Sequence, residues 1–331
     1  MKKSVLLVLL ILVLPTLCLA DDQATPTVRV GVLNFGTVNW ELDALKHYGI
    51  EKKFNVNIEV VPLGSKNATS VALQGGAVDI IVTDWIWVSR MRHDGIPYTF
   101  FPYSMTVGSL YVRPDSAINS LPMLQGKKLG IAGGPVDKSW LLLRAYALAK
   151  FDLNLEQAVD PTFAAPPLLN ELMLRGDLDA VLNFWHYGAR LEAAGMKPLI
   201  SVPELLRGLG ITSPVPLLGW VFNEKWAESN KSALVNFLRA SYAAKSLLAR
   251  SDREWDRIRP LTKAADDITL HALRDAYRAG IPQHFASQEI EAATAVYAIL
   301  AREGGEKLTG KSQTLSQGTF WTATNPQALL P

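Results

Sequence analysis

Two aspartates are the acidic side chains whose positions in this sequence most favour ligand binding. Asp84 directly follows an apolar stretch, and Asp137 follows a Gly133-Gly134-Pro135 turn. Paired carboxylates can accept hydrogen bonds from an amine or an aminopyrimidine. Aspartate just before a helix also commonly caps it, so a purely structural role stays open for both residues.

Tryptophans cluster at the same kind of position. Five of the nine lie just after predicted strands, namely Trp40, Trp85, Trp87, Trp140 and Trp185. Aromatic walls favour flat or cationic ligands, through stacking and through cation–π attraction worth about 0.5–2 kcal/mol. Trp85 and Trp87 are two residues apart, so on a helix they point in nearly opposite directions. We expect Trp85, rather than Trp87, to face a ligand. Packing against the core is the alternative for each.

The turn before Asp137 also favours a ligand of the opposite charge. Free backbone N–H groups at the start of a helix suit a phosphate, sulfonate or carboxylate, and Lys138 and Ser139 lie in this first turn. The ligand's charge therefore stays open. The turn is no Walker loop, because the Gly-Lys-Ser/Thr ending is missing, and no dinucleotide fingerprint follows the first predicted strand.

The sequence offers no recognisable catalytic centre. Its five histidines show no His-x-x-x-His or His-Glu-x-x-His spacing, so we predict no zinc site. Ser139 has no recognisable base partner, and no Gly-x-Ser-x-Gly elbow appears. His186 follows a predicted strand, and we interpret it as a neutral hydrogen-bond donor. We therefore predict no enzymatic activity, no cofactor and no resident metal. A hard cation bound by Asp84, Asp137 and Glu41 is an alternative that stays open.

The first twenty residues have the features of a cleavable secretory signal. Lys2 and Lys3 precede an aliphatic stretch, and small residues stand at Cys18 and Ala20. Cleavage before Asp21 would remove the only cysteine, so the exported chain could form no disulfide. No later stretch is long and apolar enough to span a bilayer, and we expect a soluble protein in the periplasm.

Length and charge exclude further classes. The 331 residues exceed what one hydrophobic core usually holds, so two domains or one large barrel are expected. Lys plus Arg number 33 and Asp plus Glu 31, without any long basic cluster, so we predict no nucleic-acid partner. The composition is 49% hydrophobic and 19% charged, which is typical of an ordered globular chain. We expect a monomer.

The elements that must position these residues alternate along the chain. Apolar stretches predict strands at 27–33, 56–62 and 78–83, and amphipathic helices lie between and after them. The pattern restarts with strands near 127–132, 161–165, 178–183 and 198–202. Alternating strands and helices imply parallel sheets with right-handed crossovers. After residue 223 the chain is mostly helical, and we expect this tail to pack on the first half.

Two extended segments, 107–113 and 214–222, join the halves and can act as a hinge. The predicted lobes are residues 21–110 with 216–331, and residues 111–215. Ligands of such sheets bind beyond the carboxyl ends of the strands. We therefore expect ten residues to bind the ligand as the lobes close, and these are Asn34, Asn39, Trp40, Ser65, Asp84, Trp85, Asp137, Trp140, Asn183 and Trp185.

Several stretches resemble a family of ABC-transporter substrate-binding proteins that includes binders of nitrate, alkylsulfonates, taurine and thiamine-precursor pyrimidines. They are Asn34-Phe35-Gly36, Tyr48-Gly49-Ile50 with the following Lys52-Lys53-Phe54-Asn55-Val56, and LQGGAVDI at 73–80, which has a counterpart in LMLRGDLDAV at 172–181. The resemblance covers most of residues 27–250. It implies a type II periplasmic-binding fold, an α/β clamshell without catalytic activity that delivers a solute to an ABC permease in the inner membrane. The stretch Asp84-Trp85-Ile86-Trp87 departs from many relatives, which have small residues there.

The resulting hypothesis is an exported protein that captures a small organic solute of flat or cationic character between its lobes. Four alternatives stay open. They are an anion of the sulfonate or nitrate type, a metal ion bound by carboxylates, a pyrimidine-synthase-like enzyme on the same fold, and a signalling subunit.

Overall fold

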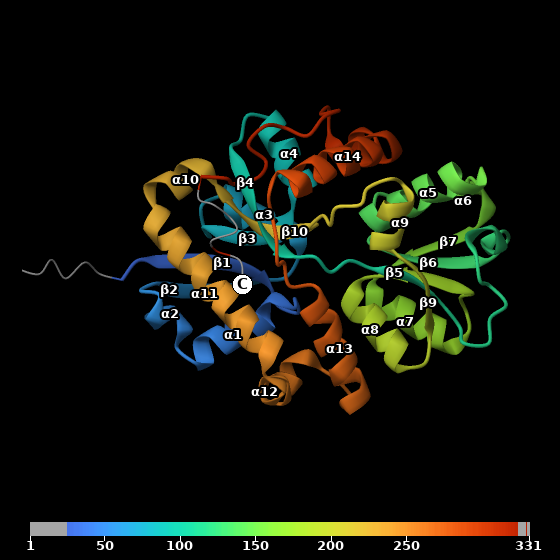
Figure 1. The fold of residues 1–331 in the computed structure, drawn as a ribbon, viewed down its shortest axis with the longest axis horizontal. Coiled ribbons are helices and arrows are strands. Elements are labelled where there is room, and N and C mark those ends of the chain that lie inside the picture. Colours follow the sequence, from blue (N-terminus) through green and yellow to red (C-terminus); the bar gives the residue numbers. More distant parts are fainter. Residues whose placement is uncertain (1–24, 324–328, 330–331) are drawn as a thin grey trace, which may run out of the picture.

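The computed structural model describes residues 25–323 and residue 329, so the predicted signal segment 1–20 lies outside the described residues. Two five-stranded sheets, each covered by helices, form two lobes that lie side by side (Figure 1). The predicted α/β class with two lobes is confirmed.

The sheet of the first lobe has the strand order β2-β1-β3-β10-β4. Its strands are β1 (Thr27–Leu33), β2 (Asn57–Leu63), β3 (Ile80–Asp84), β4 (Tyr98–Ser104) and β10 (Leu218–Asn223). The first three are parallel, and β10 runs antiparallel between β3 and β4. Val28 and Val30 of β1 are completely buried, as expected for a strand covered on both faces. The helices among these strands are α1 (Val38–His47), α2 (Ile50–Lys53), α3 (Lys66–Gln74) and α4 (Trp85–His93).

The second lobe repeats this plan with the strand order β7-β6-β8-β5-β9. Its strands are β5 (Ser109–Val112), β6 (Lys128–Ala132), β7 (Asp160–Ala164), β8 (Ala180–Asn183) and β9 (Lys197–Ser201). Here β5 runs antiparallel between β8 and β9, while β6 is parallel to β7 and β8. The helical segments are η1 (Leu121–Leu124), α5 (Lys138–Phe151), α6 (Leu155–Ala158), α7 (Pro166–Arg175), α8 (Trp185–Ala193) and α9 (Val202–Gly208).

The chain crosses between the sheets through segments 105–108 and 209–217. The first crossing leads into β5 and the second into β10, so each crossing ends in an antiparallel strand inside the sheet that it enters. Gly108 ends the first crossing, and a Cβ atom there would lie 2.0 Å from the backbone oxygen of Asn183. Glycine is therefore the residue that lets the crossing segment approach β8 closely.

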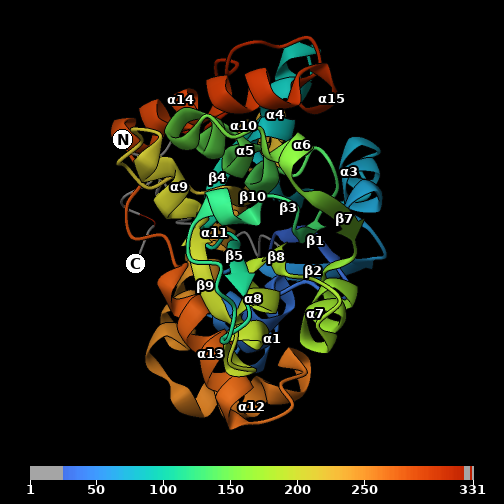
Figure 2. The ribbon, with the colours of Figure 1, turned by 90° about the vertical axis from the view of Figure 1, so that its right-hand side faces the viewer.

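The C-terminal helices are α10 (Glu224–Ser229), α11 (Lys231–Arg250), α12 (Asp252–Thr262), α13 (Asp267–Ala279), α14 (Ser287–Gly304) and α15 (Glu306–Thr309). As expected, α11 packs on the first lobe, against α1 and β1. However, α13 also packs against α8 and α14 against α5, so this tail contacts both lobes (Figures 1 and 2). Within the described chain, no helix has the length and apolar character needed to cross a membrane.

Candidate functional site

Asp84 connects the two lobes. It ends β3 and caps α4, because its Oδ1 accepts the backbone N–H of Trp87 at 2.9 Å. Its Oδ2 accepts two ammonium groups, from Lys66 of α3 at 2.8 Å and from Lys138 of α5 in the other lobe at 3.0 Å. We call these three residues the Asp84 bridge. The predicted capping role is thus confirmed, and the same carboxylate also makes a contact between the lobes.

The Asp84 bridge is held in its charged form. Burial by itself would raise the pKa of Asp84, since its side chain is almost inaccessible, but Lys138, Lys66 and the Trp87 N–H hold that pKa well below its usual value. Burial likewise disfavours charge on Lys138, yet Asp84 and Asp137 raise the pKa of its ammonium group. An ion pair between partly desolvated groups is stronger than one on the open surface.

Asp137 caps α5 in the second lobe. Its Oδ1 accepts the backbone N–H groups of Ser139 at 2.9 Å and Trp140 at 3.3 Å. Gly133 has a φ of +85°, and a Cβ atom there would lie 2.6 Å from the Asp137 carboxylate, so glycine makes room for this cap. Burial raises the pKa of Asp137.

Four aromatic side chains form a second contact between the lobes. Trp40 of α1 and Trp185 of α8 meet edge to face with their ring centroids 6.0 Å apart. Tyr277 of α13 lies 6.4 Å from Trp185, and Trp255 of α12 lies 5.8 Å from Trp40. We call these four residues the interlobe aromatic cluster. Edge-to-face pairs at such distances are attractive, beyond the apolar area that they bury.

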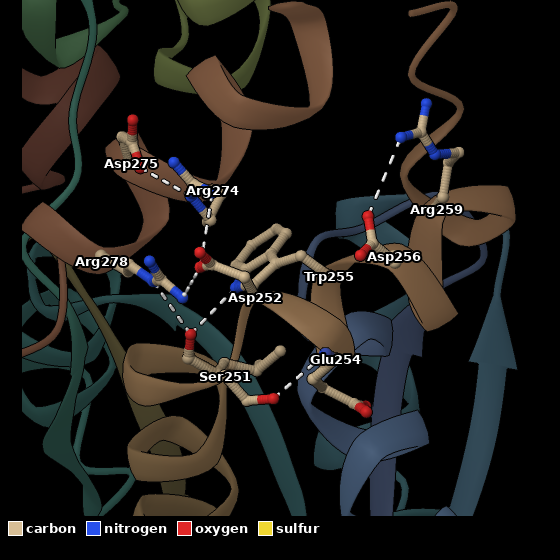
Figure 3. Close-up of polar contacts among 10 residues, drawn as sticks. Ser251, Asp252, Glu254, Trp255, Asp256, Arg259, Arg274, Asp275 and Arg278 are labelled. Carbon is tan, nitrogen blue, oxygen red and sulfur yellow. Dashed lines mark hydrogen bonds and ion pairs between the residues drawn. The ribbon is translucent and has the colours of Figure 1, made fainter. Parts of the chain in front are cut away.

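A network of arginine and aspartate side chains fixes the helices that carry two members of this cluster. Arg278 of α13 bonds to Asp252 of α12 at 2.7 Å, and Arg274 lies 3.4 Å from the same carboxylate (Figure 3). The backbone oxygen of Leu248 accepts both the Trp255 indole at 2.9 Å and Arg278 Nε at 3.1 Å. These bonds hold α12, α13 and the end of α11 together.

Glu41 is buried under the interlobe aromatic cluster. It pairs with the buried Lys245 of α11 and accepts the hydroxyl of Tyr277 at 3.3 Å. Ser241 also donates to it. Lys245 therefore already neutralises the charge of Glu41. The structure does not support the hypothetical cation site formed by Asp84, Asp137 and Glu41. Among the residues that the structure describes, no group of three or more His, Cys, Asp or Glu could hold a metal ion.

Helix α8 begins with Trp185, which contacts Trp40 of the first lobe, and within the described residues its N-cap residue makes no side-chain cap. The N-cap residue of α8 is Phe184. The first backbone hydrogen bond of the helix runs from the N–H of Tyr187 to the backbone oxygen of Phe184. Arg190, farther along α8, donates to the backbone oxygen of Thr262 at 2.7 Å, at the end of α12. His186 Nδ1 is buried and has no hydrogen-bond partner within the described residues. Burial, helped by Arg190, lowers the pKa of His186 to about 4, so the imidazole is neutral near pH 7.

The structure places two predicted tryptophans in the protein core. Trp85 is completely buried and donates its indole N–H to the backbone oxygen of Pro216, while Tyr297 and Phe320 pack around it. Trp140 is also buried. Trp87, which we expected to face away from a ligand, is partly exposed and stacks on Tyr98.

Four other predicted residues have local structural contacts or lie exposed. Ser65 caps α3 through the backbone N–H of Ala68. Asn39 closes the turn after β1 by donating to two backbone oxygens, and Asn183 ties β8 to α7 through Pro166 and Asn170. Asn34 is exposed just after β1. Of the ten predicted residues, Trp40, Asp84 and Trp185 therefore make direct side-chain contacts between the lobes.

Two residues of the Asp84 bridge, Lys66 and Lys138, were not among the predicted binding residues. Lys66 follows the predicted cap Ser65, and Lys138 was noted only as a basic residue in the first turn of its helix. In the sequence the two residues share one feature, since each is a lysine that directly follows the capping residue of a helix. That feature becomes informative only when the two helices are known to face each other.

Comparison with solved structures identifies the fold. The periplasmic aliphatic sulphonate-binding protein SsuA of Escherichia coli superposes with a TM-score of 0.70 at 18% identity, over 90% of this chain and 92% of that one. The alkanesulfonate-binding protein SsuA of Xanthomonas axonopodis pv. citri, bound to MOPS, gives 0.67 at 18% identity, over 90% and 98%. The periplasmic nitrate-binding protein NrtA of Synechocystis gives 0.55 at 14% identity, over 76% and 70%. The fold is thus that of the periplasmic binding proteins.

The sequence itself matches no family model, and no curated protein matches it either. The fold expected from the resemblance is confirmed, and the structural neighbours named above are binding proteins.

Proposed function

We propose that this protein is an exported solute-binding protein that captures a small organic anion between its lobes and delivers it to an ABC importer. The observation that carries the anionic ligand is the Asp84 bridge, in which lysines from opposite lobes meet at one carboxylate oxygen. Each ammonium group has three N–H donors, and the bond to Asp84 uses one of them. Donors therefore remain on both sides of the junction between the lobes.

By contrast, the carboxylates of Asp84 and Asp137 already accept hydrogen bonds from groups of the protein. Asp84 accepts three N–H groups, and Asp137 Oδ1 accepts two. A cationic solute would have to displace lysines to reach Asp84, whereas an anion is attracted by both lysines and by their remaining N–H donors. The uncapped N-terminus of α8 provides further donors in the second lobe. This reverses the cationic preference expected from the sequence.

The interlobe aromatic cluster supports an organic rather than a purely inorganic ligand. Trp185 is partly exposed in the same lobe as Lys138, and we infer that it contacts a flat or apolar part of the solute while the anionic group binds the lysines. Closure of the lobes around such a solute would form one surface from both lobes, and this surface is what the permease would recognise.

A thermal-shift panel tests the ligand class. Methanesulfonate, benzenesulfonate, benzoate and nitrate are compared with benzyltrimethylammonium and with divalent cations, with and without chelator, on the chain from Asp21. A ligand at 100 times its Kd adds about 2.7 kcal/mol of stability. Stabilisation by an organic anion supports the proposal, and stabilisation only by the quaternary amine or a chelatable metal contradicts it.

The transport role and the export need their own test. Cells that lack the protein should lose high-affinity uptake of the anion that stabilises it, and a copy in trans should restore this uptake. Mass spectrometry of the periplasmic protein should show cleavage before Asp21. Normal uptake in the deletion strain would argue for a signalling subunit instead.

A further inference from the structure

We propose that Asp84 is a specificity-determining residue that competes with the anionic group of the solute for Lys66 and Lys138. This inference rests on the proposed function, since it concerns the same pair of lysines. The Asp84 carboxylate has the charge and the acceptor oxygens of the proposed ligand, and its Oδ2 already lies between the two ammonium groups. A solute that binds both lysines must therefore share them with Asp84 or displace it.

The two oxygens of Asp84 have separate roles. Oδ1 caps α4 through the Trp87 N–H, while Oδ2 contacts only the two lysines among the hydrogen bonds of this side chain. Asparagine caps a helix about as well as aspartate does. The helix therefore needs an oxygen at this position but no negative charge. The negative charge of Asp84 instead pairs with the positive charges of Lys66 and Lys138.

The bond to Lys138 gives this competition a second effect. Lys138 belongs to α5 and Asp84 to the first lobe, so their bond holds the lobes together without any solute contact. The side chain of Lys138 is 20% exposed and that of Lys66 is 55% exposed, so Lys138 is the more shielded partner. A solute anion takes over a contact between the lobes that Asp84 otherwise makes.

The competition selects among anions. A weakly bound ion such as chloride gains little by replacing a carboxylate that is already fixed next to both lysines. An anion with several acceptor oxygens and an apolar part gains contacts on both lobes. Asp84 thus sets a threshold that favours a strongly accepting organic anion over the common inorganic ones.

The test is Asp84→Asn, with Asp94→Asn as a matched control. Asp94 is exposed at the other end of α4, so its substitution makes the same change in charge away from the bridge. Circular dichroism and melting curves check that both variants fold. Calorimetry then measures the affinity for benzenesulfonate, methanesulfonate and nitrate, and small-angle scattering without added ligand measures how compact the two-lobed protein is.

We expect Asp84→Asn to bind benzenesulfonate about tenfold tighter than the wild type, because a charged competitor for the two lysines is removed. We also expect the unliganded variant to be more extended, and Asp94→Asn to match the wild type in both respects. Unchanged or weaker anion binding by Asp84→Asn, while the wild type binds, overturns the inference and leaves the proposed function standing. An equally compact Asp84→Asn overturns the role in holding the lobes. If no anion binds any of the three proteins, the proposed ligand itself is wrong.

Discussion

The indole rings of Trp40 and Trp185 meet edge to face across the junction between the lobes, at 84° and with their centroids 6.0 Å apart. Trp40 is also fixed within its own lobe, because its indole donates to the backbone oxygen of Leu261 and its ring packs on Trp255. Trp185 is partly exposed, and Tyr277 is its other aromatic contact from the first lobe. The same contact therefore belongs to the core on the Trp40 side and to a partly exposed surface on the Trp185 side.

This asymmetry predicts different effects of two alanine substitutions. Trp40→Ala should lower the free energy of unfolding by about 3–5 kcal/mol, because it removes a buried indole from a packed core. Trp185→Ala should cost about 1–2 kcal/mol, while weakening benzenesulfonate binding about tenfold through the lost aromatic contact. Denaturant unfolding and calorimetry measure the two quantities. Equal losses of stability in both variants would contradict the asymmetry.

Substitution of the lysines should separate binding from folding. Lys66→Met and Lys138→Met each remove one charged donor, and each should weaken binding of an anionic probe by about 10- to 100-fold. Lys138→Met should also lower the melting temperature more than Lys66→Met, since its ammonium group is more buried. Lys231→Met, an exposed substitution at the start of α11, is the control of equal charge. Anion affinity that is the same in all three variants would argue against the lysine site.

His186 should make stability depend on pH. Its pKa is about 4 in the folded protein, below the usual 6.5, so between these values the unfolded chain binds more protons. The free energy of unfolding therefore rises with pH through this window, and the contribution is lost as the pH falls from about 6.5 to 4. The gain amounts to at most about 3 kcal/mol. In His186→Gln, which cannot titrate, the difference in stability between pH 7 and pH 4 should shrink. Parallel pH profiles for the two proteins would contradict this assignment.

The buried Glu41–Lys245 pair should be strongly coupled. Lys245 also lies over the ring of Tyr103 at 3.5 Å, so its charge has two stabilising neighbours. Glu41→Gln or Lys245→Met alone should cost about 3–5 kcal/mol, because each leaves an uncompensated buried charge. The double variant should cost clearly less than the sum of the two. A double-mutant cycle from denaturant unfolding measures this coupling, and additive losses would show that the pair is not a unit.

The sequence predicted the parallel strands and most helices well. The strand 27–33 is found as β1, and the helical region expected after residue 223 contains the long helix α11. β4 was missed because its stretch YTFFPYS is apolar on both faces and contains Pro102, and so shows no alternation. α12 lies in the region predicted to be helical, but its bounds were not predicted, because Pro260 and its many charged residues obscure an apolar stripe formed by Trp255 and Ile258.

The candidate site was harder to predict than the fold. Position after a strand brought out Asp84, which the structure places at a contact between the lobes, because that rule follows from the geometry of parallel sheets. It could not show that Trp85 turns into the core, since the direction of a side chain on α4 depends on how Tyr297 of α14 and Phe320, which follows the last helix, pack around it. Nor could it pair Lys66 with Lys138, because their contact with Asp84 depends on the relative orientation of two lobes.

The C-terminal helices also restrict how this molecule can move. α13 lies against α8 and α14 against α5, and the two contacts are on opposite sides of the lobe junction (Figure 1). The backbone N–H of Met105, in the first crossing segment, also donates to the backbone oxygen of Gly280 just after α13. A lobe that simply swung away would strip apolar area from both helices at once. Sliding α8 along α13 and α5 along α14 while the lobes separate keeps part of that area covered, so we expect opening of the lobes to include shear between packed helices.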